Sequence, residues 1–412
     1  MWRDLFGQAW EAMHHNRRRT LITVIGMAWG IATVVLLLAY GAGFSRAIEA
    51  IFSQFGTNMM GVFPGTTSEQ AGGKKAGVAV KFQLSDVDLL ENAVPGILHI
   101  SPDVSKDVTV QNETHSYTWS VISGYPGIAD IQKLDIDYGR FYSTKDLEER
   151  NHVAVIGSEA KTKLYSGLYP IGQRIRLKGV PFTVIGVLKA KMQEGNDNIN
   201  RVIYIPFSTM SDIKDTKYLD GIWFNYQGNY QTTETAVRTT LGAAHSFRAS
   251  DRNAVFVANL MEQLSQFRVI STGLEVLMAF IGTLTLGIAG IGLMNIMLVA
   301  VQQRTREIGI EKALGARRGH ILFQFLTEAL VITGVGGICG IALAYLVSIA
   351  VGRITLYSAI ASNGEAADIQ LLISPHSVLI ATVILVVVGL VSGMLPALRA
   401  ASLNPVEALR YE

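Results

Sequence analysis

Four long runs of apolar residues dominate the hydropathy pattern of this chain. They lie at roughly 21–42, 276–301, 329–352 and 377–398, and each carries at most one ionisable residue, near an end. About 20 residues in a helix, at about 1.5 Å rise each, cross a hydrocarbon core of about 30 Å. A large soluble core could also bury four helices, but soluble folds seldom need helices that are apolar on every face. The pattern therefore predicts four transmembrane helices.

Positive charge then predicts the orientation of these helices, because short loops rich in Lys and Arg stay in the cytoplasm. Three arginines at 17–19 precede the first run, a charged segment at 302–320 separates the second from the third, and Arg399 and Arg410 follow the fourth. Both termini and the segment 302–320 are therefore expected in the cytoplasm. The long segment 43–270 is expected outside, since long domains translocate largely regardless of charge.

The outer segment alternates between strand and helix patterns. Apolar and polar residues alternate at 117–122, 153–156, 174–177, 182–188, 202–205 and 222–226, which predicts strands. Helices are expected at 86–93 after a Ser85 cap, at 159–165 and at 232–241. The residues Lys178–Pro181 suit a hairpin turn between two strands. The predicted fold is a four-helix membrane protein with a large mixed α/β domain inserted between helices 1 and 2 on a helical stalk.

The stalk is predicted from apolar residues that keep helical spacing beyond the first span and ahead of the second. The first helix would continue outward from its span, and the second would begin near a cap at Asp251 or Asn253. Such continuous helices would pass movement of the spans to the outer domain. The residues that carry the pattern are Phe44, Ile48, Phe52 and Phe55 on the first helix, and Phe256, Leu260, Leu264, Phe267 and Ile270 on the second.

Small residues recur at a spacing of four inside three of the spans. This spacing lets helices approach closely. The pairs are Gly26 and Gly30, Gly336 and Gly340, and Gly389 and Gly393. No charged residue lies near the middle of any span, which disfavours secondary transport through an ion or proton path.

Composition excludes several other classes of function. The formal charge of +2 gives no reason to expect nucleic acid as a partner, and the single cysteine, Cys339, lies inside the third span. The eight histidines form no metal or nucleophile pattern, so no cofactor or metal is expected on this chain. Residues 1–19 form an amphipathic segment with Trp2, Leu5, Phe6, Trp10 and Met13 at helical spacing, expected along the inner membrane surface.

Several motifs in this order resemble the permease subunits of MacB-type ABC transporters, which are related to lipoprotein-releasing permeases and more distantly to FtsX. The resemblance covers nearly the whole chain. Its parts are Thr20-Leu-Ile-Thr-Val-Ile-Gly26, Gly56-Thr-Asn-Met-Met-Gly-Val-Phe-Pro-Gly65, Val153-Ala-Val-Ile-Gly157, Pro170-Ile-Gly-Gln-Arg-Ile-Arg-Leu177, Gly292-Leu-Met-Asn-Ile-Met297, Arg304-Thr-Arg-Glu-Ile-Gly309, Ala313-Leu-Gly-Ala316, Pro396-Ala-Leu-Arg-Ala-Ala401 and Asn404-Pro-Val-Glu-Ala-Leu-Arg410.

The resemblance implies a multi-pass protein of the bacterial inner membrane that works as a homodimer or heterodimer of permeases, with ATP and Mg bound on an ABC ATPase. It also implies that the turn between spans 2 and 3 docks on that ATPase. The contact would fall on Arg304, Arg306, Glu307, Ile308, Lys312, Gly315 and Ala316. A periplasmic adaptor and an outer-membrane duct are further partners that the resemblance leaves open.

One departure from the MacB pattern concerns the ATPase itself. In MacB the ATPase precedes the first span on the same chain, whereas here about twenty residues precede it, and Gly72-Gly-Lys-Lys lacks the spacing of a phosphate-binding loop. The ATPase is therefore expected on a separate subunit. Two functions stay open: ATP-driven efflux or extraction of a substrate, and FtsX-like activation of an outer partner without transport. The full set of outer strands favours the first.

These expectations divide the chain into eleven segments. From the N-terminus they are an amphipathic segment 1–19, helix 1 at 20–42, a stalk helix at 43–56, the α/β domain at 57–250, a second stalk helix at 251–271, helix 2 at 272–301, a coupling loop at 302–320, helix 3 at 321–352, an outer loop at 353–376, helix 4 at 377–398 and a cytoplasmic tail at 399–412.

Overall fold

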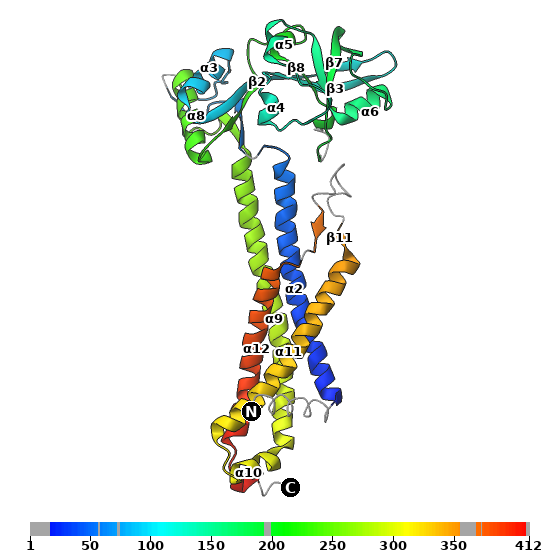
Figure 1. The fold of residues 1–412 in the computed structure, drawn as a ribbon. Coiled ribbons are helices and arrows are strands. Elements are labelled where there is room, and N and C mark those ends of the chain that lie inside the picture. Colours follow the sequence, from blue (N-terminus) through cyan, green and yellow to red (C-terminus); the bar gives the residue numbers. More distant parts are fainter. Residues whose placement is uncertain are drawn as a thin grey trace. The chain divides into compact units, whose positions relative to one another are not determined.

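The computed structural model describes residues 17–56, 58–71, 75–192, 199–354, 368–371 and 373–408. The chain forms two compact units: a helical unit of Met1–Arg46, Val269–Ile354 and Ile369–Glu412, and an α/β unit of Ala47–Arg268 with Thr355–Asp368 (Figure 1). The apolar positions of the predicted N-terminal segment, Trp2 to Met13, lie outside the described residues.

Among its described residues, the helical unit contains four helices that are long and apolar enough to cross a membrane. They are α2 (Arg17–Ser53), α9 (Leu260–Gln303), α11 (Arg318–Val351) and α12 (Pro375–Ser402). The prediction of four spanning helices is therefore confirmed. Two short helices, α10 (Thr305–Ala313) and α13 (Pro405–Ala408), join the ends of this unit, and the strands β11 (Arg353–Ile354) and β12 (Ile369–Gln370) pair across the expected outer loop.

Five of the six predicted packing glycines lie where two helices touch. A Cβ added at Gly30 would lie 2.9 Å from Leu286 of α9, and one at Gly336 would lie 2.7 Å from Met27 of α2. A Cβ added at Gly340 would contact Ile31 of α2. Cβ atoms added at Gly389 and Gly393 would contact Thr333 and Ala329 of α11, respectively. Gly26 differs, because nothing described lies within 4 Å of its Cβ position. Small residues therefore join α2 to α9 and to α11, and α11 to α12.

The α/β unit is built on a ten-stranded sheet with helices packed against it (Figure 1). Its strand order is β10-β1-β9-β2-β3-β8-β5-β7-β4, and β6 pairs with both β2 and β7. The strands are β1 (Met59–Pro64), β2 (Ile97–Gln111), β3 (Ser116–Gly124), β4 (Ile136–Gly139), β5 (Val153–Ile156), β6 (Arg174–Leu177), β7 (Val180–Leu188), β8 (Ile203–Pro206), β9 (Gly221–Tyr226) and β10 (Val255–Asn259).

The helices of this unit are short except one. They are α3 (Leu84–Ala93), α4 (Ile128–Ile131), α5 (Thr144–Glu148), α6 (Ser158–Tyr165), α7 (Phe207–Met210) and α8 (Tyr230–His245), with a 3₁₀ turn at Ile199–Arg201. All three predicted helices are present. The Ser85 cap is wrong, because α3 begins at Leu84 and the Asp86 carboxylate accepts a hydrogen bond from the Gln83 amide.

Each predicted strand also corresponds to an observed one, and the hairpin at 178–181 joins β6 to β7. Leu177 pairs with Val180, and the two residues between them have positive φ, 51° at Lys178 and 90° at Gly179. This is the geometry of a two-residue type I′ turn, whose twist matches that of the strands. Strands β1, β2, β4 and β10 of this unit were not predicted, and the residues of β10 were assigned to the second stalk helix.

The second stalk helix begins later than the sequence suggests, which corrects the boundary at 251. Residues 255–259 form β10, an edge strand that pairs with β1, and α9 starts at Leu260. Asn259 is the cap, because its Oδ1 accepts from the amide of Met261 at 3.1 Å. The Asp251 carboxylate instead accepts from the amides of Ser68 and Glu69 at 2.7 and 3.0 Å. Phe256 therefore belongs to the sheet.

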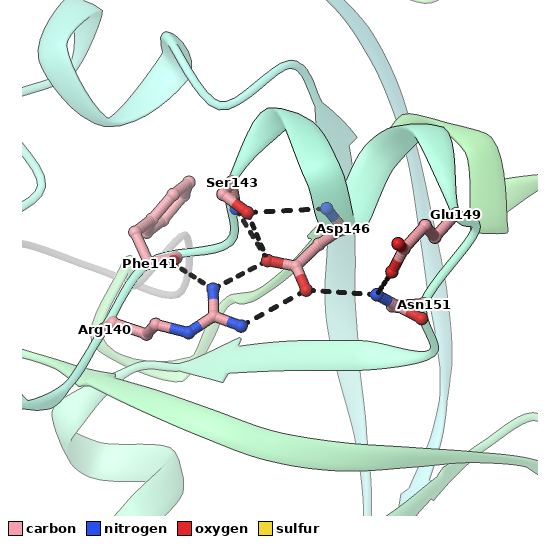
Figure 2. A network of polar contacts seen from close by, with 6 residues as sticks. All are labelled: Arg140, Phe141, Ser143, Asp146, Glu149 and Asn151. Atoms are coloured by element: carbon pink, nitrogen blue, oxygen red, sulfur yellow. Dashed lines mark hydrogen bonds and ion pairs between the residues drawn. The ribbon is translucent and has the colours of Figure 1, made fainter.

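A buried carboxylate fixes the loop around α5 (Figure 2). Asp146 accepts from Arg140 Nη1 at 2.6 Å, from the amide and hydroxyl of Ser143 at 2.8 Å each, and from Asn151 Nδ2 at 3.3 Å. These donors, Arg140 above all, hold the pKa of Asp146 far below its usual range. The loop thereby holds Phe141 and Tyr142 in a core cluster that also contains Tyr204.

Candidate functional site

The predicted coupling segment forms a helical hairpin that ends in a glycine turn. The amide of Leu314 donates to the carbonyl of Ile310, and the amide of Ala316 donates to that of Glu311. Gly315 lies between them with φ of 101°, a region that side chains with a Cβ rarely adopt. The turn then leads through Arg317 into α11.

Two basic residues of this hairpin form polar contacts inside the helical unit. Lys312 Nζ donates to the carbonyls of Ala401 and Leu403, both at 2.6 Å, and so caps the end of α12. Arg304 Nη1 lies 3.2 Å from Glu328 Oε2 of α11. These contacts hold α10 against its neighbours and direct both side chains inward.

Ile308 is also internal, because it is buried in a cluster with Leu293, Met297, Ile321 and Phe325. The other predicted coupling residues lie at the surface of the hairpin. Arg306, Glu307 and Gly315 are exposed, and Ala316 is half-buried. Two apolar residues that the sequence did not single out join them. Leu314 is 84% exposed and Ile310 is 46% exposed.

The two stalk helices pack against each other within the α/β unit. The rings of Phe52 and Phe267 lie 5.4 Å apart, Glu49 Oε1 lies 3.6 Å from Arg268 Nη2, and Leu264 is buried. Leu260 packs against a core cluster of the domain. The predicted apolar stripes thus face each other at these positions, and Ile48 is half-buried.

The same pair of helices is joined within the helical unit. Ser45 Oγ donates to Glu275 Oε1 at 2.9 Å, next to the half-buried Phe44. A Cβ added at Gly41 would lie 2.9 Å from Cγ of Glu275, so the helices approach closely there. Helices α2 and α9 are therefore neighbours in both units.

The end of α2 is held by two lysines of the α/β domain, which we call the joint. Lys191 Nζ donates to the carbonyls of Gln54 and Gln132 at 2.9 and 2.6 Å, and Lys133 Nζ donates to the carbonyl of Ser53 at 3.1 Å. The last carbonyls of a helix are unpaired and carry partial negative charge, so both ammonium groups stabilise them.

Lys191 is the buried member of this joint. Burial lowers the pKa of its ammonium to about 8. Its Nζ also lies 5.3 Å from the ring centroid of Phe55, and the amide of Met192 donates to Gln54 Oε1 at 2.9 Å. The sequence reasoning missed Lys191, since a single lysine after a strand resembles any solvated surface residue.

Together these features define a multi-pass membrane protein whose large α/β domain lies between its first two spanning helices. Residues 20–242 match the model of the MacB-like periplasmic core domain, and residues 279–405 match that of the FtsX-like permease C-terminal region. The first match alone covers more than half of the chain. The chain belongs to the family of MacB-like, FtsX-related ABC transporter permeases of the inner membrane.

Curated relatives align over almost all of this chain. A macrolide export ATP-binding/permease protein MacB of Bdellovibrio bacteriovorus is 31% identical over 98% of this chain, and a pyoverdine export ATP-binding/permease protein PvdT of Pseudomonas putida is 33% identical over 98%. The chain spans 61% and 59% of these two relatives. The periplasmic region of MacB from Actinobacillus actinomycetemcomitans is similar over 52% of this chain and 94% of its own, with 21% identity and a TM-score of 0.42.

Proposed function

We propose that this chain is the permease of an ABC exporter and passes ATP-driven motion to its α/β domain on the outer side of the membrane. An ABC ATPase subunit would bind ATP and Mg and dock on the α10 hairpin. The assembly would contain two permease chains and two ATPase domains, with both termini of each permease in the cytoplasm. In a two-membrane envelope an adaptor and a duct would complete the path.

The exposed leucine of the hairpin carries this proposal. Leu314 presents almost its whole side chain at a turn whose shape is fixed by Gly315, with Arg306 and Glu307 exposed on the same hairpin. A highly exposed apolar residue on a charged hairpin is typical of a protein contact, because its burial gains free energy only when a partner covers it. The inward contacts of Arg304 and Lys312 keep the hairpin in shape for docking.

The stalk and the joint support transmission of motion. Each of α2 and α9 is a single helix that contributes to both units, and each is fastened to the α/β domain at its end. Lys191 and Lys133 hold α2, while β10 and the Asn259 cap hold α9. A helix fastened in this way transmits displacement instead of bending freely.

Export is favoured over FtsX-like signalling by the match to the MacB-like periplasmic core domain and by relatives named as exporters. Signalling without transport remains the alternative, because the FtsX-like region is common to both branches. The two differ in whether a substrate leaves the outer compartment.

Docking can be tested by co-purification with the ABC ATPase. We expect Leu314→Glu, Glu307→Lys and Gly315→Val each to lower the affinity for the ATPase by about tenfold or more. Close contacts across a protein interface contribute on the order of 1–5 kcal/mol. Glu113→Lys, a charge reversal in the exposed β2–β3 turn, is the matched control and should bind normally. Normal binding by all three hairpin variants would exclude the hairpin as the docking site.

The same preparations test where ATP is hydrolysed. The 412 residues contain no Gly-x-x-x-x-Gly-Lys-Ser/Thr loop, so the purified chain should release no phosphate until the ATPase is added. Phosphate release by the chain alone that survives removal of contaminating ATPases would contradict this part of the proposal.

A further inference from the structure

A cavity of about 650 Å³ opens in the α/β unit beside the end of α2. Its apolar wall includes three aromatic residues, Phe55, Tyr204 and Trp223, together with Met59 and Ile122, and Trp119 adjoins it. Cavities of about 300–1,000 Å³ with such walls and a few polar groups are typical of sites for small organic molecules.

The aromatic wall is fixed from behind. Trp223 Nε1 donates to Asp103 Oδ2 at 3.0 Å, and the hydroxyl of Tyr204 donates to Gln132 Oε1 at 2.9 Å. The loop of Figure 2 adds Phe141, whose ring centroid lies 6.2 Å from that of Tyr204. A wall held in this way is preorganised, so a ligand does not have to order it on binding.

The polar residues of the cavity indicate which ligand would fit. Asp107 and Arg201 carry opposite charges, and Arg201 Nε already lies 3.0 Å from Glu159 Oε1. Thr118, Ser120 and Gln132 add neutral hydrogen-bonding groups. Glu159, which pairs with Arg201, is itself balanced by Lys163 Nζ at 2.9 Å, so the charges in and around the cavity sum to zero. The cavity therefore offers little to a strongly anionic or cationic molecule. It suits a neutral molecule with an apolar ring system and polar substituents.

We propose that this cavity binds a neutral, amphipathic organic molecule with a ring system, and that this is the substrate class of the exporter. The assignment to substrate rests on the proposed export function. The cavity also adjoins the joint, because Phe55 lines it and Gln132, another lining residue, accepts the hydrogen bond from Lys191. A bound molecule would therefore lie against the end of α2.

The two tryptophans of the cavity allow a direct test on the full chain in lipid nanodiscs. With Trp2, Trp10 and Trp29 changed to Phe, Trp119 and Trp223 are the remaining tryptophans of the five. Energy transfer from them to dansylamide, a neutral aromatic sulfonamide, then reports binding near the cavity. Ser120→Phe and Thr118→Phe add bulk to the lining, while Ser116→Leu, which adds bulk to an exposed position of the same strand outside the lining, is the matched control.

We expect saturable energy transfer that weakens at least tenfold in both Phe variants and is unchanged in Ser116→Leu. Circular dichroism and elution volume show whether each variant is folded. Two positions are substituted by Phe so that the test still holds if one of the two variants does not fold. Absence of a saturable signal, or equal affinity in the folded Phe variants, would overturn the proposal. The assay needs no ATPase, so failure here with normal ATPase docking would refute this site and leave the coupling function intact.

Discussion

At the scale of single residues, the α/β domain contains a carboxyl group whose ionisation opposes folding. Asp103 is buried and its Oδ1 has no hydrogen-bond partner among the described residues. Burial, only partly offset by the indole of Trp223, raises the pKa of Asp103 to about 6. The folded state therefore favours the protonated acid, whereas the unfolded chain ionises near pH 4.

The sign of the pH effect follows from this difference. Below about pH 4 the acid is protonated in both states, so burial of charge costs nothing. As the pH rises through 4 to 6 the unfolded state gains its charge first, so the free energy of unfolding falls by on the order of 3 kcal/mol and stays lower above pH 6. Asp103→Asn can still accept from Trp223 but cannot ionise.

We therefore expect the melting temperature of the α/β domain to fall between pH 4 and pH 7 by more in the wild type than in Asp103→Asn. Tryptophan fluorescence can follow both, since Trp223 lies against the substituted residue. Other carboxylates, such as Asp146 with its depressed pKa, destabilise the fold in acid but act equally in both proteins. Identical pH profiles of the wild type and Asp103→Asn would show that the ionisation of Asp103 does not destabilise the folded domain.

Residue spacing alone could not sort the hairpin into internal and exposed positions. Ile308 and Ile310 are two residues apart, so helical spacing places them on opposite faces of α10, but it does not say which of the two faces is buried. Lys312 and Arg304 look like surface charges in sequence, but their partners, the carbonyls of 401 and 403 and the carboxylate of Glu328, lie about 90 and 24 positions away. The need for φ above zero at Gly315 was local and could be predicted.

At the scale of elements, the long helices were predictable because length and uniform hydropathy determine them. The start of α9 was not, since Phe256, Leu260 and Leu264 keep a spacing of four across a strand and a helix. Pairing of β10 with β1, about 195 residues earlier in the chain, decides the conformation of 255–259. The long strand β2 was missed because its buried run at 100–104 contains Ser101, Pro102 and Asp103, residue types that are depleted in strands.

The joint gives a prediction for the end of α2. Lys191→Met keeps the length of the side chain but leaves the carbonyls of Gln54 and Gln132 without their ammonium donor. A buried carbonyl without a partner costs about 1–3 kcal/mol, so α2 should fray near residues 50–56. We expect faster hydrogen exchange there and a melting temperature lower by several degrees.

Lys189→Met is the matched control, because Lys189 is exposed and lies two residues earlier on the same segment. It should leave both measurements unchanged. Equal exchange at 50–56 in the Lys191 variant and the wild type would mean that the lysine does not hold the helix end.

At the scale of the whole molecule, the order of elements and the motifs sufficed to indicate the family, while the functional geometry came from contacts between distant segments. The joint brings together residues near 54, 132 and 191, and the hairpin meets the chain near 401. No local pattern encodes such proximity. On the proposed coupling path, nucleotide bound to the ATPase changes the α/β domain through α2 and α9.

The most direct test compares hydrogen exchange in the assembled complex with a non-hydrolysable ATP analogue and with ADP. We predict that peptides of the joint, at 52–56 and 189–192, and of the β10–α9 junction, at 255–262, exchange differently in the two states. Four glycines inserted into both stalk helices, after Arg46 of α2 and after Arg268 of α9, should abolish these differences while the hairpin still responds; four glycines inserted after Glu113 should not. Nucleotide-independent exchange in the α/β domain of the wild type, or differences that survive the stalk insertion, would contradict the account.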